Sequence, residues 1–179
     1  MAAGAQRMQP LPLHRAWQFL QALTARPLTV AEQAEVAAIL SPAQQLLFWQ
    51  MSSGDQRHSL QVMRTLIAME MTAPDLLVAA LLHDVGKSRH QLYLWERVVV
   101  VVIGAFGPSA ASRWGTAPSH GWRRPFVIYQ QHPRWGAEMA LAAGCSPLTA
   151  ELIRAHHDQG GAHTHSKLLR ALQQADSVN

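Results

Sequence analysis

The sequence LLVAALLHDVGK, at residues 76–87, decides the fold of this chain. Seven apolar residues, Leu76–Leu82, precede His83 and Asp84, and this pattern is typical of a buried helix. A histidine and an aspartate behind such a run are costly to bury unless they are paired or bind a metal ion. Because neighbouring helical residues point about 100° apart, both side chains can face one site only where the helix ends. We predict that Gly86 supplies that end.

Helix start and stop signals continue on both sides of this stretch. Residues 29–32 (TVAE) and 41–44 (SPAQ) have the form of capping boxes, and Pro42, Pro74 and Pro147 suit a first helical turn. Gly144 and Gly160 lie where further helices could stop, and alternating strand patterns are absent. We therefore predict an all-α fold with helices near residues 14–25, 30–40, 42–51, 56–71, 74–84, 133–143, 147–157 and 165–176.

Residues 88–131 interrupt this pattern and are interpreted as an insert. They hold three tryptophans and the β-branched run Val98–Ile103, which propensity alone would favour as a strand. No partner strand is visible, so we expect a buried or docked helix there. The insert carries five arginines against one glutamate, a balance of +4 that equals the formal net charge of the whole chain. Such a segment could contact an anionic membrane surface, or pack on the helical body or a second subunit as a homodimer.

Length and composition place the chain among folded intracellular proteins. With 179 residues, 49% of them hydrophobic, it can bury a core and is not disordered. One cysteine cannot form an internal disulfide, which favours a reducing, cytoplasmic location. The longest uncharged apolar run, Val98–Phe106, falls short of the roughly twenty residues of a membrane span. We expect a soluble protein, with the insert as a candidate contact to a membrane surface.

Five histidines and two aspartates could form a metal site. Each lies on or at the end of a predicted helix, and the set comprises His58, His83, Asp84, His132, His156, His157 and Asp176. Imidazole and carboxylate ligands suit manganese, iron, cobalt, nickel or zinc. Cys145 lies outside every cluster, which argues against a structural zinc site.

In order and character these elements resemble the HD superfamily of metal-dependent phosphohydrolases. LLHDVGK is similar to the central motif of the HDIG group, and the QHP, GAEMA and HHD elements resemble the HD-GYP branch, which cleaves cyclic dinucleotides. The resemblance covers roughly residues 55–179 and implies an HD-domain helical bundle with a metal site in its core. It divides the chain into an N-terminal helical annex (1–52) and an HD domain (53–179). It also implies that the seven residues named above are the ligands of a two-metal centre.

The sequence departs from the HD-GYP pattern at three places. QGGAHTHSK follows His157-Asp158, so the GYP signature is missing, and Gly54 stands where three-metal members keep a glutamate. The long insert is the third departure. These differences favour two metals over three and argue against cyclic dinucleotides. Residues 87–89 also lack the acidic pair of alarmone hydrolases.

The constellation predicts hydrolysis of a nucleotide or other phosphate ester. Two divalent cations outweigh the charges of Asp84 and Asp176 and so attract a phosphate group, while lowering the pKa of bound water. Iron or manganese is the expected metal, with zinc, cobalt or nickel as alternatives. The resemblance implies that Asp84 bridges both ions. Lys87 could contact a phosphoryl oxygen, or it could simply be a cation at a helix C-terminus.

Two other functions stay open at this point. Inositol oxygenases have a ligand set that resembles this one, and they use a di-iron pair with O₂. An HD-fold oxygenase is therefore one alternative. The other alternative is a non-catalytic HD module that senses a nucleotide. The intact ligand set argues against it, because a non-catalytic module would be expected to have lost ligands. The predicted partner is a phosphorylated small molecule or a nucleotide, and no specific nucleic-acid binding is expected.

Overall fold

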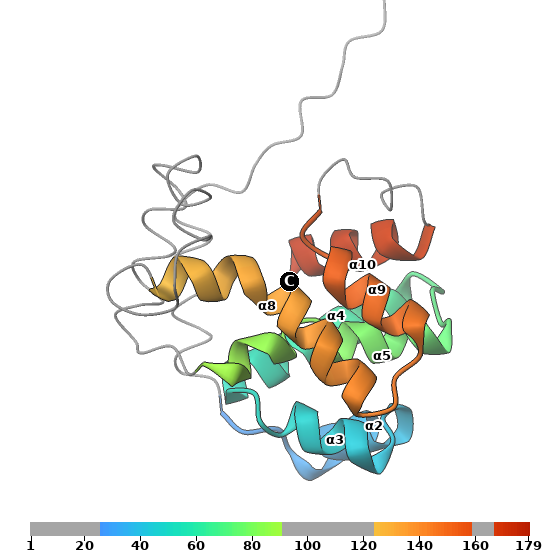
Figure 1. Cartoon of the computed structure of the whole chain (residues 1–179). Helices are drawn as coiled ribbons and strands as arrows, with labels where there is room; N and C mark the ends of the chain where they lie inside the picture. Colours follow the sequence, from blue (N-terminus) through green and yellow to red (C-terminus); the bar gives the residue numbers. More distant parts are fainter. Residues whose placement is uncertain (1–25, 91–123, 159–166) are drawn as a thin grey trace, which may run out of the picture.

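The computed structural model describes residues 26–90, 124–158 and 167–179, and within them it contains α-helices, one 3₁₀ helix and no strand (Figure 1). The predicted all-α fold is therefore confirmed. The elements are α2 (Val30–Ile39), α3 (Pro42–Phe48), α4 (Ser53–Ala68), α5 (Pro74–Leu82), η1 (Val85–Arg89), α8 (Arg124–Ala142), α9 (Pro147–Ala155) and α10 (Lys167–Val178). In these parts of the chain, no helix has the length and apolar character needed to cross a membrane.

The predicted helix signals act as expected where they are described. Thr29 and Glu32 form a reciprocal capping box at α2, and Ser41 and Gln44 form one at α3. Proline stands in the first turn of α3, α5 and α9. Gly144, with a φ of +79°, follows the end of α8 in the left-handed conformation that favours glycine. These ends follow from local backbone chemistry, so the sequence alone reveals them.

The prediction that Gly86 ends the helix is wrong. α5 already ends at Leu82, and the chain continues into η1, which contains Gly86. Asp84 separates the two helices with φ −95° and ψ 0°. The predicted consequence still holds, because His83 and Asp84 stand at the point where the helix stops. Gly86 has a different role, which is close packing against α8.

The predicted start of the helix at Pro133 is also wrong. α8 begins at Arg124, within the predicted insert, and carries Pro133 in its interior. Proline cannot donate a backbone hydrogen bond and so tends to bend a helix, and α8 changes direction along its length in Figure 1. The first turns persist because they bury Phe126, Val127 and Ile128, and tertiary packing thus outweighs the local proline signal.

α5 is the centre of the hydrophobic core. Leu76, Leu81 and Leu82 have no exposed surface, and a helix that is apolar all round must be covered on every side. α2, α3, α4, α9 and α10 all pack against α5. Each fully buried leucine contributes about 1.5–3 kcal/mol relative to an exposed one. The core therefore fixes the C-terminal end of α5, where the candidate site begins.

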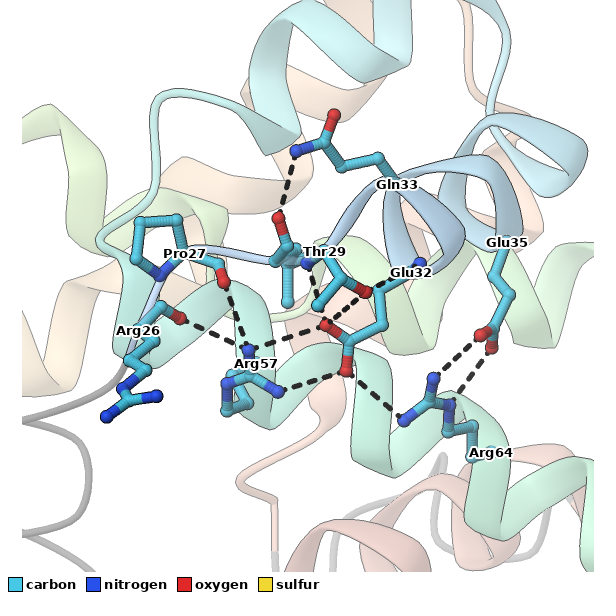
Figure 2. Close-up of polar contacts among 9 residues, drawn as sticks. Arg26, Pro27, Thr29, Glu32, Gln33, Glu35, Arg57 and Arg64 are labelled. Atoms are coloured by element: carbon cyan, nitrogen blue, oxygen red, sulfur yellow. Dashed lines mark hydrogen bonds and ion pairs between the residues drawn. The ribbon is translucent and has the colours of Figure 1, made fainter.

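A polar network joins α2 to α4 (Figure 2). Arg57 Nη1 donates to Glu32 Oε1 at 3.0 Å, and Arg64 Nη2 donates to Glu35 Oε1 at 2.7 Å. Arg57 also donates to the backbone carbonyl of Pro27 at 3.2 Å. Residues predicted as an N-terminal annex thus contact the helix that carries His58, and α2 and α3 contribute to the same core as α5.

Several predictions fall on residues that the structure does not describe. The predicted helix at 14–25 and the run Val98–Ile103 are among them. Residues 91–123 are outside the described ranges, so the proposed membrane or dimer contact of the insert stays a prediction. Of the predicted insert, residues 124–131 belong to α8.

Candidate metal centre

All of the predicted ligands come together from six helical elements or their ends. α4 carries His58, and α10 carries Asp176. His83 and Asp84 lie between α5 and η1, and His132 lies in α8. His156 and His157 directly follow α9, which ends at Ala155. Residues as far apart in the sequence as 58 and 176 thus meet at one place.

Two groups of three side chains have ligand atoms within 4.8 Å of one another. The first, here called the His58 group, contains His58, His83 and Asp84. The second, the His132 group, contains His132, His156 and His157. Either group could hold a metal ion, because nitrogen and oxygen donors at such separations suit transition metals.

Asp84 lies between the two groups. Its Oδ1 is 3.3 Å from His132 Nε2, and its Oδ2 is 3.6 Å from His83 Nε2. Each carboxylate oxygen therefore faces a different group. Asp176 joins the His58 group from α10, since its Oδ1 is 2.9 Å from His58 Nε2 and 3.6 Å from His83 Nε2.

Three imidazoles are oriented by backbone carbonyls of their own helices. The Nδ1 atom of His83 donates to Ala80 at 2.8 Å, and the Nδ1 atom of His156 donates to Ile153 at 2.7 Å. His132 Nδ1 donates to the carbonyl of residue 128 at 3.2 Å. An Nδ1 atom bound to the backbone leaves Nε2 directed away from the backbone, as in histidines that bind metal.

These three Nε2 atoms have no hydrogen-bond partner. Among the described residues, four buried side-chain polar atoms lack one, and three of the four are Nε2 of His83, His132 and His156. Unsatisfied buried polar atoms are rare and cost about 1–3 kcal/mol each. Metal ions held by the two groups would satisfy all three, so the residues present fit a metal centre.

The His132 group consists of neutral ligands. Burial lowers the pKa of His132 and holds the pKa of His156 well below its usual range. Burial, together with the neighbouring His132, lowers the pKa of His157 to about 3. Neutral imidazole is the form that binds a cation, so these side chains require no proton loss before they coordinate one.

The His58 group is more strongly charged. Burial alone would lower the pKa of His83, but Asp84 and Asp176 outweigh burial and raise it to about 9. Burial alone would raise the pKa of each carboxyl group. Lys87 and His83 nevertheless hold the pKa of Asp84 well below its usual range, and the hydrogen bond from His58 and the nearby His83 ring do the same for Asp176. Both aspartates are therefore ionised.

Lys87 approaches the centre from η1. Its Nζ donates to Asp84 Oδ2 at 2.5 Å. Burial alone would lower the pKa of this amine, but Asp84 and Asp55 outweigh burial and raise it above its usual value. Lys87 is thus a fixed positive charge beside the carboxylate that faces both groups.

The centre has a buried floor and a partly exposed rim. His83, Asp84, His132 and His156 are at most 3% exposed. By contrast, the side chains of His58, Asp176 and Lys87 are 28%, 25% and 29% exposed. The exposed parts of these three side chains therefore connect the cluster to solvent.

Two features beside the centre escaped sequence reasoning. Tyr129 lies one helical turn before His132, and its ring centroid is 5.2 Å from that of His157. Gly86 and Gly136 allow η1 and α8 to approach closely. A helix predicted to start before residue 132 would have placed Tyr129 near the site by its spacing of three. The glycine contact depends on packing between distant segments and has no local signal.

A protein-family model described as HD domain matches residues 56–179. The matched range contains every residue of both groups, together with Asp176 and Lys87. No curated protein and no solved structure matches the chain.

Proposed function

This chain belongs to the HD domain family, and from that premise we propose that it is a metal-dependent phosphohydrolase in which a two-metal centre hydrolyses a nucleotide or other phosphate ester. The observation that carries the proposal is the set of three buried Nε2 atoms without hydrogen-bond partners, on His83, His132 and His156. Their backbone-bound Nδ1 atoms and the ionised carboxylate of Asp84 complete an arrangement suited to cations.

Each group would hold one ion, with Asp176 added to the His58 group. His58, His83 and Asp176 would bind the first ion, and His132, His156 and His157 would bind the second. Asp84 would contribute one oxygen to each, because its two oxygens face different groups. Iron or manganese suits this nitrogen and oxygen donor set, in which no thiolate takes part.

The charges of the centre favour an anionic substrate. With neutral imidazoles, the two aspartates and Lys87 sum to one negative charge, and two divalent cations would change this to three positive charges. The cations supply Lewis-acid stabilisation of phosphoryl charge and activation of water. Lys87 contributes a positively charged donor at the exposed rim, where it would hold a phosphoryl oxygen. A neutral substrate would gain little from this field.

The test is hydrolysis by the full chain loaded with Mn²⁺ or, without oxygen, Fe²⁺. Release of phosphate or alcohol from a panel of phosphomonoesters and phosphodiesters is measured beside metal content. We expect turnover by the wild type and loss of both metal and turnover in His83→Ala. His90→Ala is the matched control, because His90 contacts Trp135 and belongs to neither group.

Failure of every ester in the panel, with metal bound, would overturn the proposal. Oxygen uptake together with the EPR signal of a mixed-valent iron pair would assign the chain to the oxygenase alternative instead. A wild type that binds less than one metal ion per chain would favour the non-catalytic alternative.

A further inference from the structure

Tyr129 is an exposed aromatic side chain at the edge of the metal centre. Its ring centroid is 5.2 Å from that of His157 and 6.1 Å from that of His132. The side chain is nevertheless 52% exposed. It therefore borders the ligands of the His132 group while a large part of its surface stays open to solvent.

The other aromatic side chains among the described residues have different surroundings. Phe48 and Phe126 are buried in the core. Trp49, directly after α3, is 38% exposed and packs edge-on against Phe48. Trp135 contacts His90 and Arg89. Within the described part of the chain, Tyr129 alone combines an exposed aromatic ring with contact to the candidate ligands.

The position of this ring suits the organic part of a substrate. A phosphoryl group drawn to the centre would lie beside His157, and the group esterified to it would extend toward the exposed side. A planar ring one sugar away from the phosphate could then stack on Tyr129. Aromatic side chains bind nucleobases in this way, through the π-face that every base presents.

We propose that Tyr129 is a specificity-determining residue whose ring stacks on a planar aromatic group of the substrate, as in a nucleoside monophosphate. This inference rests on the proposed function and narrows its substrate class. Stacking requires the ring and not the hydroxyl group, so phenylalanine should replace tyrosine while leucine should not.

The experiment compares the metal-loaded wild type with Tyr129→Phe and Tyr129→Leu. KM and kcat are measured with a nucleoside monophosphate and with glycerol phosphate, which has no ring. Dissociation constants for a nucleoside phosphonate and for methylphosphonate are measured by calorimetry, which reports binding without turnover. Trp49→Leu is the matched control, since it removes a partly exposed aromatic ring that packs against Phe48 and lies outside both ligand groups.

We expect Tyr129→Leu to raise KM and the dissociation constant for the nucleoside compounds on the order of tenfold, a typical value of one stacking contact. The kcat, the metal content and the constants for the ring-free compounds should stay as in the wild type. Tyr129→Phe and Trp49→Leu should behave as the wild type does.

Equal effects of Tyr129→Leu on both kinds of compound would overturn the inference, and so would a Tyr129→Phe variant as impaired as Tyr129→Leu. A wild type that hydrolyses glycerol phosphate as efficiently as the nucleotide would overturn it while the proposed function stands. A wild type that binds metal but hydrolyses neither ester would count against the proposed function. In that case, weaker binding of the nucleoside phosphonate to Tyr129→Leu alone would still support stacking.

Discussion

A Cβ atom on Gly86 would lie 2.0 Å from the backbone carbonyl oxygen of His132, a distance that no real side chain tolerates. The same atom would lie 2.7 Å from the backbone nitrogen of Gly136. The absence of a side chain at Gly86 thus lets η1 lie directly against α8. Asp84, two residues earlier, comes within 3.3 Å of His132 Nε2 as a result. This backbone contact therefore sets the separation of the two ligand groups.

Gly86→Ala should separate these elements and weaken metal binding. The added methyl group meets backbone atoms, which cannot rotate away, so we expect a loss of about 1–3 kcal/mol in the free energy of unfolding of the metal-free protein. Metal content should fall below that of the wild type, because Asp84 can no longer face both groups. Urea denaturation and elemental analysis of the folded protein measure the two effects.

Gly144→Ala is the control for this prediction. Gly144 has a φ of +79° and open space around the position of a Cβ atom. Alanine there should cost about 1 kcal/mol through backbone strain alone and leave metal content unchanged. A full metal complement in Gly86→Ala would show that the glycine contact does not position the centre.

His156→Leu should separate metal binding from packing. His156 is 3% exposed, and its Nε2 atom has no hydrogen-bond partner. Replacing an unsatisfied polar ring by an apolar side chain of similar size should change the unfolding free energy of the metal-free protein by less than about 1 kcal/mol, or raise it. The stabilisation that Mn²⁺ gives the wild type, about 2.7 kcal/mol at a hundred times the dissociation constant, should be largely lost.

Leu152→Ala, on the same helix, should behave in the opposite way. Leu152 is 2% exposed, so its truncation should destabilise the metal-free and metal-loaded proteins alike, by about 2–5 kcal/mol. Thermal denaturation with and without Mn²⁺ distinguishes the two patterns. If His156→Leu destabilised the metal-free protein as much as Leu152→Ala does, His156 would be a core residue and not a ligand.

The sequence predicts those parts of the fold that depend on local chemistry. The capping boxes at Thr29 and Ser41 concern residues three apart, and the apolar run of α5 has only one environment that suits it. The convergence of His58 and Asp176 was predictable through the family resemblance, because order and spacing identify the motif. Their distance of 2.9 Å, across 118 residues of sequence, has no local signal.

Other features depend on contacts between distant segments. A proline such as Pro133 usually lies in the first turn of a helix. Here the burial of Phe126 and Ile128 extends α8 beyond it toward the N-terminus. Tyr129 enters the neighbourhood of the site only through that extension. Gly86 has the appearance of a helix stop, whereas its position is determined by the backbone of α8, more than forty residues later. Local patterns cannot reveal such requirements.

Glu32→Gln should make the free energy of unfolding depend less on pH. The backbone of Thr29 and the guanidinium of Arg57 lower the pKa of Glu32 from 4.5 to about 2. A carboxyl group whose pKa is lower in the folded than in the unfolded protein stabilises the fold at any pH above its unfolded-state pKa. This stabilisation is lost as the pH falls to the folded-state pKa. The free energy of unfolding of the wild type should therefore exceed that of Glu32→Gln by about 1 kcal/mol at pH 7, a figure reduced for solvent screening. This difference should vanish as the pH falls from 4.5 to 2.

Urea denaturation at several pH values measures this difference, and an Arg57→Gln background supplies the control. Without the Arg57 guanidinium, the Glu32 carboxyl keeps the Thr29 hydrogen bonds and the 3.6 Å ion pair with Arg64, so the effect of Glu32→Gln should shrink. A difference between wild type and variant that grew as the pH fell would contradict the linkage.

Lys87→Met should affect metal and phosphate in opposite directions. The Lys87 ammonium lies 2.5 Å from Asp84 Oδ2, where it competes with a cation for the same oxygen. Its removal should retain or tighten the binding of Mn²⁺. A phosphate ester, in contrast, loses a charge-assisted hydrogen bond worth about 1.5–3 kcal/mol, so KM and the dissociation constant of inorganic phosphate should rise at least tenfold.

Calorimetry with each ligand measures both effects, and Lys87→Arg, which keeps the charge, should stay closer to the wild type. Loss of metal together with phosphate would instead make Lys87 a structural support of Asp84, because the carboxylate would then need its lysine partner to stay in place.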